Sequence, residues 1–110
     1  MRTLKSPSEI DDLFRSGRRG STELILVLSL RTPEQRGPEG RVVFVAGKKL
    51  GGAVMRNRCK RVLRASTARC GGPWSGFDVA IIARKDAATS SPADLDACLV
   101  SALRKAGASL

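Results

Sequence analysis

The spacing of hydrophobic and polar positions predicts a helix at the start of the chain. Residues 6–9 (SPSE) form a capping-box sequence with proline at the first helical position. Ile10, Leu13 and Phe14 follow at helical spacing and give one apolar face, and Gly17 is a suitable end. A helix this short must pack against another element to persist.

Three apolar runs of strand length lie further along the chain, at residues 23–30, 41–46 and 78–84. The first run is continuously apolar, which is typical of a strand that is covered on both faces or lies in the middle of a sheet. We expect the first two runs to pair as a hairpin across a long loop. A further short strand is possible near Thr22 or Lys48.

Two more helices complete the pattern. One is expected over residues 53–70, ended by Gly71, Gly72 and Pro73. The last begins at residues 90–94, with Pro92 just inside the cap, and closes at Gly107. The order predicts an α+β fold, a two-layer sandwich of the form α-β-β-(β)-α-β-α. The length of 110 residues indicates one domain, 1–110.

Composition narrows the chemistry. The chain has 20 Lys and Arg, 10 Asp and Glu and no His, so its formal charge is +10. Without His, catalytic pairs of Ser or Cys with His and His-ligated metals are excluded. We predict no catalytic residue and no metal site on the protein. A compact basic domain without such chemistry is expected to bind a polyanion, and here a nucleic acid.

The cysteines and the apolar runs indicate where the protein acts. Cys59, Cys70 and Cys98 are odd in number and form no metal-binding pair, so we expect three free thiols, buried as small apolar side chains. The first 20 residues lack the apolar core of a signal peptide, and no run is long enough to span a membrane. We therefore expect a cytoplasmic protein with no membrane partner.

The positive charge is concentrated in one segment. No acidic residue occurs between Glu39 and Asp78, and at 100° per residue the helix within this segment has one cationic arc and one apolar arc. The segment contains nine cations: Arg41, Lys48, Lys49, Arg56, Arg58, Lys60, Arg61, Arg64 and Arg69. A solvated helix face is the simplest interpretation, but the missing acids favour a bound polyanion.

The few aromatic residues bear on how RNA would be bound. The chain has no Tyr, so a stacking platform for several bases is poorly supplied, and binding should depend on phosphates and on salt. Phe14 and Phe44 fit a core position better than a stacking position. A DNA-binding regulator is the weaker alternative, because no second helix directly adjoins the basic one in sequence.

Residues 48–64 read KKLGGAVMRNRCKRVLR. This segment resembles the signature of the bacterial ribonuclease P protein subunit, in which paired lysines and a glycine precede A-V-x-R-N-R-x-K-R-x-x-R. The early helix ending in Phe14-Arg15-Ser16-Gly17, the late strand at residues 77–84 and the closing amphipathic helix also fit, so the resemblance covers almost the whole chain.

The resemblance implies a protein subunit that binds a catalytic RNA and the 5′ leader of precursor tRNA. The RNA would perform the cleavage with Mg²⁺, and no protein partner is required. It also implies a left-handed crossover through the basic helix, and a cleft between the sheet and the first helix that receives the leader. The RNA-binding residues carried over by the motif are Lys48, Lys49, Arg56, Asn57, Arg58, Lys60, Arg61 and Arg64.

The leader cleft would be lined by Ile10, Phe14 and Phe44. Here the chain departs from the family pattern, since Ile10, Glu23 and Leu28 stand where a Phe, a basic residue and a Tyr are expected. These changes leave the basic helix intact. The alternative is a structural RNA-binding protein of ribosomal type, which a basic helix alone does not distinguish.

Overall fold

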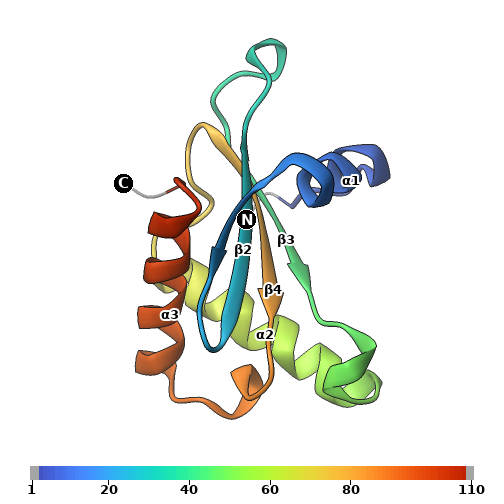
Figure 1. The fold of residues 1–110 in the computed structure, drawn as a ribbon, viewed down its shortest axis with the longest axis vertical. Coiled ribbons are helices and arrows are strands. Elements are labelled where there is room, and N and C mark those ends of the chain that lie inside the picture. The colour runs from blue at the N-terminus through green and yellow to red at the C-terminus, as the bar shows by residue number, and fades with distance from the viewer. Residues whose placement is uncertain (1–2, 109–110) are drawn as a thin grey trace.

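The chain folds around a four-stranded sheet with strand order β1-β2-β4-β3 (Figure 1). The computed structural model describes residues 3–108. The strands are β1 (Arg18–Ser21), β2 (Ile25–Arg31), β3 (Arg41–Val45) and β4 (Phe77–Ala83). The helices are α1 (Pro7–Ser16), α2 (Ala53–Arg69) and α3 (Pro92–Lys105), with short 3-10 helices η1 (Glu34–Arg36), η2 (Lys48–Leu50) and η3 (Ala87–Thr89).

Strand β4 organises the sheet. It pairs antiparallel with β2 over seven residues and parallel with β3 over five. The expected hairpin between the first two apolar runs is therefore wrong: β2 forms its hairpin with the short strand β1, and β3 is an edge strand. The reason is burial, because Val79, Ala80 and Ile81 are all inaccessible to solvent and a strand apolar on both faces belongs in the middle of a sheet.

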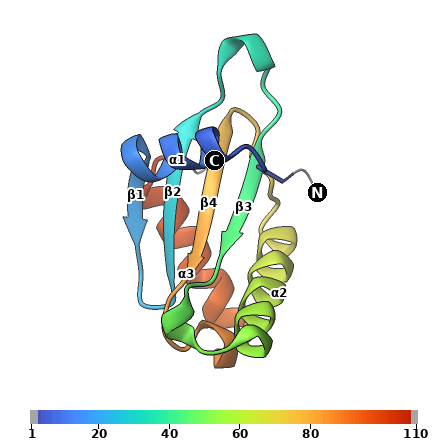
Figure 2. The same cartoon turned by 90° about the vertical axis from the view of Figure 1, so that its right-hand side faces the viewer.

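Helices cover the two faces of the sheet unequally. On one face α3 packs on β1 and β2 while α2 packs on β3 and β4, which gives the expected two-layer sandwich. On the other face α1 crosses only one end of the strands (Figure 2). The β3–α2–β4 connection is left-handed, as the resemblance implied, although such crossovers are right-handed in about 98% of cases.

Alternation along the strands separates two cores. The larger core lies between the sheet and the α2–α3 layer and includes Val42, Leu63 and Leu99. The smaller core holds Leu13 and Leu28 under α1. Arg41 on β3 holds α1 against the sheet, because its guanidinium donates to the Glu9 carboxylate of α1 and lies 3.7 Å from the Asp78 carboxylate of β4.

The helix boundaries agree closely with the sequence, but one cap differs. Ser91 caps α3 as expected, since its hydroxyl accepts from the Asp94 backbone N–H at 3.1 Å. Ser6 makes no capping bond to α1, and its hydroxyl instead lies 3.2 Å from the Ser8 hydroxyl. The Ser6 half of the predicted capping box is therefore absent, while the Glu9 carboxylate accepts from Arg41.

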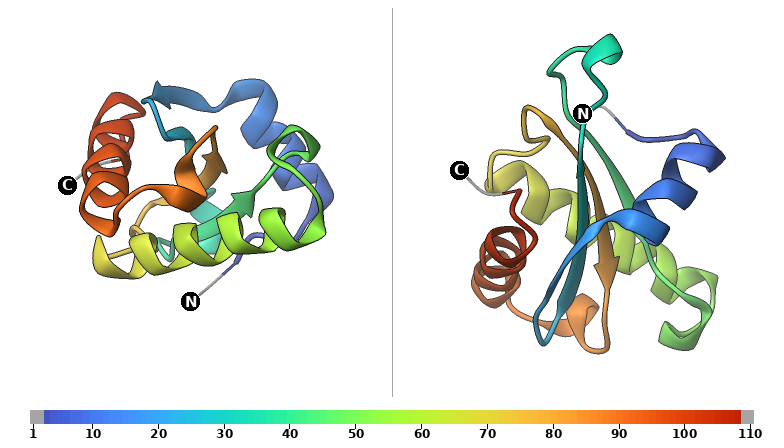
Figure 3. Two further views of the ribbon diagram at one scale, coloured as in Figure 1. Left: turned by 90° about the horizontal axis from the view of Figure 1, so that it is seen from below. Right: turned by 45° about the horizontal axis from the view of Figure 1, so that its top comes forward.

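The loop between α2 and β4 lies at the end of the sheet opposite η2 and η3. Trp74 in this loop is buried at 3% exposure. Its carbonyl lies so close to Gly40 that a Cβ there would sit 2.0 Å from the oxygen. The link between β2 and β3, which includes η1, extends beyond this end of the sheet (Figure 3, right).

Gly20 provides a test of the packing between β1 and α3. A Cβ at Gly20 would lie 2.0 Å from the Ala102 carbonyl oxygen, whereas a Cβ at Gly47 would meet nothing within 4 Å. We expect Gly20→Ala to lower the free energy of unfolding by about 1–3 kcal/mol, as overpacking does. Gly47→Ala is the control and should change it little. Equal unfolding curves for the two variants in urea would contradict this packing.

Candidate nucleic-acid interface

The cationic arc of α2 faces solvent along its whole length. Its exposed members are Asn57, Arg58, Lys60, Arg61 and Arg64, while Arg56 is half-buried. The opposite side of the helix buries Cys59, Leu63, Ser66 and Thr67. Within residues 3–108, none of the arc's cations forms an ion pair with an acid. The predicted division into a buried arc and a cationic arc is confirmed.

The first turns of α2 project beyond α3 (Figure 3, left), so they are open to a large partner. Gly52 caps the helix without a side-chain hydrogen bond, and the first turn contains no acid. The backbone N–H groups of that turn and the helix dipole both favour a bound anion. Cations near this end cost roughly 0.3–1 kcal/mol each, and a phosphate would reverse the sign of that contribution.

Lys48 and Lys49 extend the cationic surface past the start of the helix. Both lie on η2 and are exposed. A glycine with φ of 132° at position 51 turns the chain from η2 into α2, a conformation that other residues rarely adopt. The eight residues predicted from the sequence therefore form one surface, which runs from η2 along the outer side of α2.

Phe44 does not line the cleft on the α1 side, so that prediction is wrong. Its register partner is Ile81, and both belong to the core beneath α2 and α3. The Arg64 guanidinium lies 5.3 Å from the centre of the Phe44 ring, in a cation–π contact. Arg64 therefore covers part of the core with its guanidinium while remaining on the cationic surface.

The cleft expected between α1 and the sheet is an open stretch of sheet surface. Phe14 is 47% exposed at its border, contrary to its expected core position, and Ile10 is half-buried against the core under α1. Beyond α1 the half-buried side chains Leu26, Val45 and Ile82 continue along the same face. Ile10 and Phe14 thus share a face with an apolar strip of the sheet.

The departures from the family pattern have different positions on this face. Leu28 is 2% exposed and lies directly beneath α1, so it acts as core. Glu23 is exposed in the turn between β1 and β2. The thiols also differ from expectation: all three are free, but only Cys59 is buried, and Cys70 and Cys98 are half-buried.

An ionic contact between α2 and α3 fixes the orientation of the cationic arc. The buried Ser66 hydroxyl donates to Asp96 Oδ1 at 2.5 Å, and Arg69 donates to both Asp96 oxygens at 2.8 and 2.9 Å. The hydrogen bond from Arg69 is the main cause that holds the pKa of Asp96 below its usual value, with Ser66 adding to it. The sequence analysis missed this contact, because nothing local relates residue 96 to residue 69.

Two further features of the surface were also missed. Val54 is 86% exposed although it lies on the cationic side of α2, beside Asn57 and Arg58. Lys85 is exposed just after β4, at the same end of the sheet as η2. A helical wheel would have identified the valine, whereas only the topology brings Lys85 close to η2. Among the described residues, no group of three His, Cys, Asp or Glu side chains could hold a metal ion.

No helix within residues 3–108 is long and apolar enough to cross a membrane.

Comparisons with known proteins agree with the geometry. The family model described as Ribonuclease P matches residues 1–107. The chain is 40% identical over 88 residues to the ribonuclease P protein component of Dehalococcoides mccartyi, a match covering 80% of this chain and 72% of the relative. It is 32% identical over 105 residues to that of Bacillus cereus, covering 94% of this chain and 90% of the relative.

Solved structures show the same fold. The ribonuclease P protein of Staphylococcus aureus superposes with a TM-score of 0.81 at 21% identity, covering 98% of this chain and 97% of that one. The protein from Thermotoga maritima superposes with a TM-score of 0.74 at 24% identity, covering 90% of this chain and 92% of that one.

Asp96 gives a test of the contact between α2 and α3. Because its folded pKa is lowered, its contribution to stability is present above the unfolded value of about 3.9 and is lost as pH falls through the lowered value. Asp96→Asn keeps an acceptor for Ser66 but loses the charge, so we expect the free energy of unfolding to fall by about 1 kcal/mol at pH 7. The deficit should shrink below about pH 4.

Asp12→Asn is the control, since Asp12 is exposed on α1. Urea unfolding between neutral and acidic pH measures the difference for both variants. A deficit for Asp96→Asn that stays constant on acidification would show that the carboxylate charge contributes nothing.

Proposed function

Since this chain belongs to the ribonuclease P protein family, we propose that it is the protein subunit of a ribonucleoprotein that removes the 5′ leader from precursor tRNA. Its family places it in an endoribonuclease complex. The observation that carries the proposal is the cationic arc of α2, whose exposed cations pair with no acid among residues 3–108 and adjoin a helix N-terminus that has no side-chain cap.

The two surfaces have different chemistry, and we assign them different RNAs. The arc of α2 with Lys48 and Lys49 offers charge and donors, which suit the phosphates of a folded catalytic RNA. The open sheet face with Ile10 and Phe14 offers apolar side chains, which suit the exposed bases of a single-stranded leader. Because the two surfaces adjoin, the protein would hold the leader beside the catalytic RNA.

The chemistry of cleavage is assigned to the RNA with bound Mg²⁺. Without His, the chain has no imidazole to act as general base. What its residues supply is positive charge. The catalytic RNA and the precursor tRNA are both polyanions and repel each other. Protein cations between them would reduce this repulsion, so less Mg²⁺ would be needed to bring the two RNAs together.

A double substitution tests the arc. Arg58 and Arg61 are both exposed and have no ion pair among the described residues, so Arg58→Ala with Arg61→Ala should leave the melting temperature unchanged or slightly higher. The affinity for the catalytic RNA should fall, and the log–log salt slope should decrease by about 1–2. Arg56 is avoided because it is half-buried.

The matched control is Arg104→Ala with Lys105→Ala, which removes the same charge from the exposed end of α3. Melting is followed by circular dichroism and affinity by filter binding at several salt concentrations. Equal losses of affinity in both double variants would mean that only net charge matters.

Reconstitution tests the function as a whole. The full chain, mixed with a ribonuclease P catalytic RNA and precursor tRNA at low Mg²⁺, should accelerate release of the leader. The protein without that RNA should release none. Gel analysis of the 5′ product measures the rate, and the absence of any acceleration over the RNA alone would refute the proposal.

A further inference from the structure

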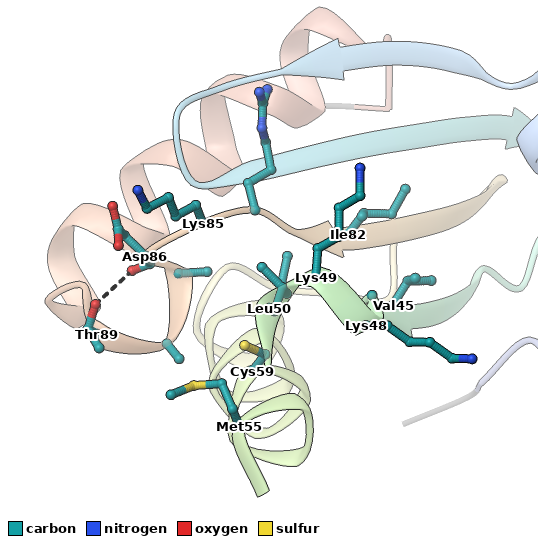
Figure 4. Close-up of a pocket in the computed structure, with 15 residues that line it drawn as sticks. Val45, Lys48, Lys49, Leu50, Met55, Cys59, Ile82, Lys85, Asp86 and Thr89 are labelled. Carbon is teal, nitrogen blue, oxygen red and sulfur yellow. Dashed lines mark hydrogen bonds between the residues drawn. The ribbon is translucent and has the colours of Figure 1, made fainter. Parts of the chain in front are cut away.

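A cavity lies where the cationic surface meets the open sheet face. It has a volume of about 990 Å³ and lies between η2, the first turns of α2 and η3, at the ends of β3 and β4 (Figure 4). Cavities that bind small molecules measure about 300–1,000 Å³. This one is therefore large enough for a chemical group the size of a nucleobase.

The walls of the cavity are mostly apolar. The lining residues Cys59, Ala87 and Ala88 are buried. The half-buried side chains of Leu50 and Met55 project from η2 and α2 (Figure 4). A thioether and aliphatic groups make favourable contacts with aromatic faces. A flat, uncharged ring fits this lining, whereas a phosphate inside it would lose its hydration without gaining partners.

The edge of the cavity is cationic. Lys49 comes from η2 and Lys85 from the opposite side, just after β4. Neither lysine pairs with an acid among the described residues, and Asp86 is the only acid of the lining. Arg84 is already engaged, since it donates to the Ser21 hydroxyl and the Thr22 carbonyl. The two lysines are thus free to bind phosphates outside an apolar cavity.

The cavity is continuous with the open sheet face. Val45 and Ile82 line it, and they are register partners whose side chains lie on the face that α1 partly covers. A single strand lying along that face from Phe14 would therefore reach the cavity at the end of β4. An acidic peptide would satisfy the lysines equally well, but a nucleotide strand supplies a flat ring and a charge at every residue.

We propose that this cavity receives one unstacked nucleobase of the single-stranded leader, with the flanking phosphates on Lys49 and Lys85. The inference rests on the proposed function, because it specifies how the open sheet face holds its RNA. It also explains how a chain without Tyr can hold a base: a Met and a Leu would replace the aromatic platform at this position.

Met55 makes the test specific. The chain has two methionines, so carbon-13 labelling of their methyl groups gives two signals, and Met55→Leu identifies the one from the cavity. A leader oligoribonucleotide that binds the full chain should shift the Met55 signal through the ring current of the base. Oligoribonucleotides with one abasic nucleotide keep every phosphate, so moving the abasic site along the strand should abolish the shift at one position.

The lysines are tested in the same titrations. Lys49→Ala and Lys85→Ala should each weaken binding of the oligoribonucleotide and reduce the magnitude of the salt slope by about 1. Lys105→Ala, an exposed lysine on α3, is the control that should change neither.

The outcomes separate the two proposals. An oligoribonucleotide that binds without moving the Met55 signal, or that moves it wherever the abasic site is placed, overturns the cavity site and leaves the proposed function standing. An equal shift from a nucleoside monophosphate at the same concentration also overturns it, because the strand would then contribute nothing. Failure of the leader to bind, together with failed reconstitution, overturns the proposed function itself.

Discussion

Burial of the uncharged side of α2 is the constraint on which the rest of the structure depends. The cations on its outer side repel one another and oppose the helix dipole, and no acid in the first turn offsets them. The helix is held by Cys59, Leu63 and Thr67 beneath it and by the contact of Ser66 and Arg69 with Asp96 on α3. Packing against the core and the contact with α3 thus offset the destabilising effect of the cations on the outer side of α2.

The two faces of the sheet have different roles: one supports α2 and the other forms the open apolar face beside α1. Because side chains alternate along β3, Val42 and Phe44 support α2 while Val43 and Val45 belong to the face that α1 partly covers. The edge strand β3 also leads directly into η2 and α2. The lysines of η2 therefore lie where the cationic surface meets the open sheet face. The arrangement keeps a charged surface and an apolar one adjacent without mixing them.

Local patterns in the sequence predicted the helices and the cationic arc well, because capping residues and helical spacing act over a few residues. They failed for the strand order, since pairing β2 with β4 rather than β3 depends on which strand can be buried on both faces. The core position expected for Phe44 is confirmed. The Asp96 contact and the cavity were missed. Each joins segments that only the left-handed crossover and the sheet bring together.

The position of Trp74 has a spectroscopic consequence. It is the single tryptophan of the chain, buried in the loop before β4, at the opposite end of that strand from the cavity and η2. Its emission should therefore respond when the chain loses its tertiary structure and remain nearly constant when a polyanion settles on the distant cationic end. Its fluorescence therefore reports unfolding rather than binding at η2 and the first turns of α2.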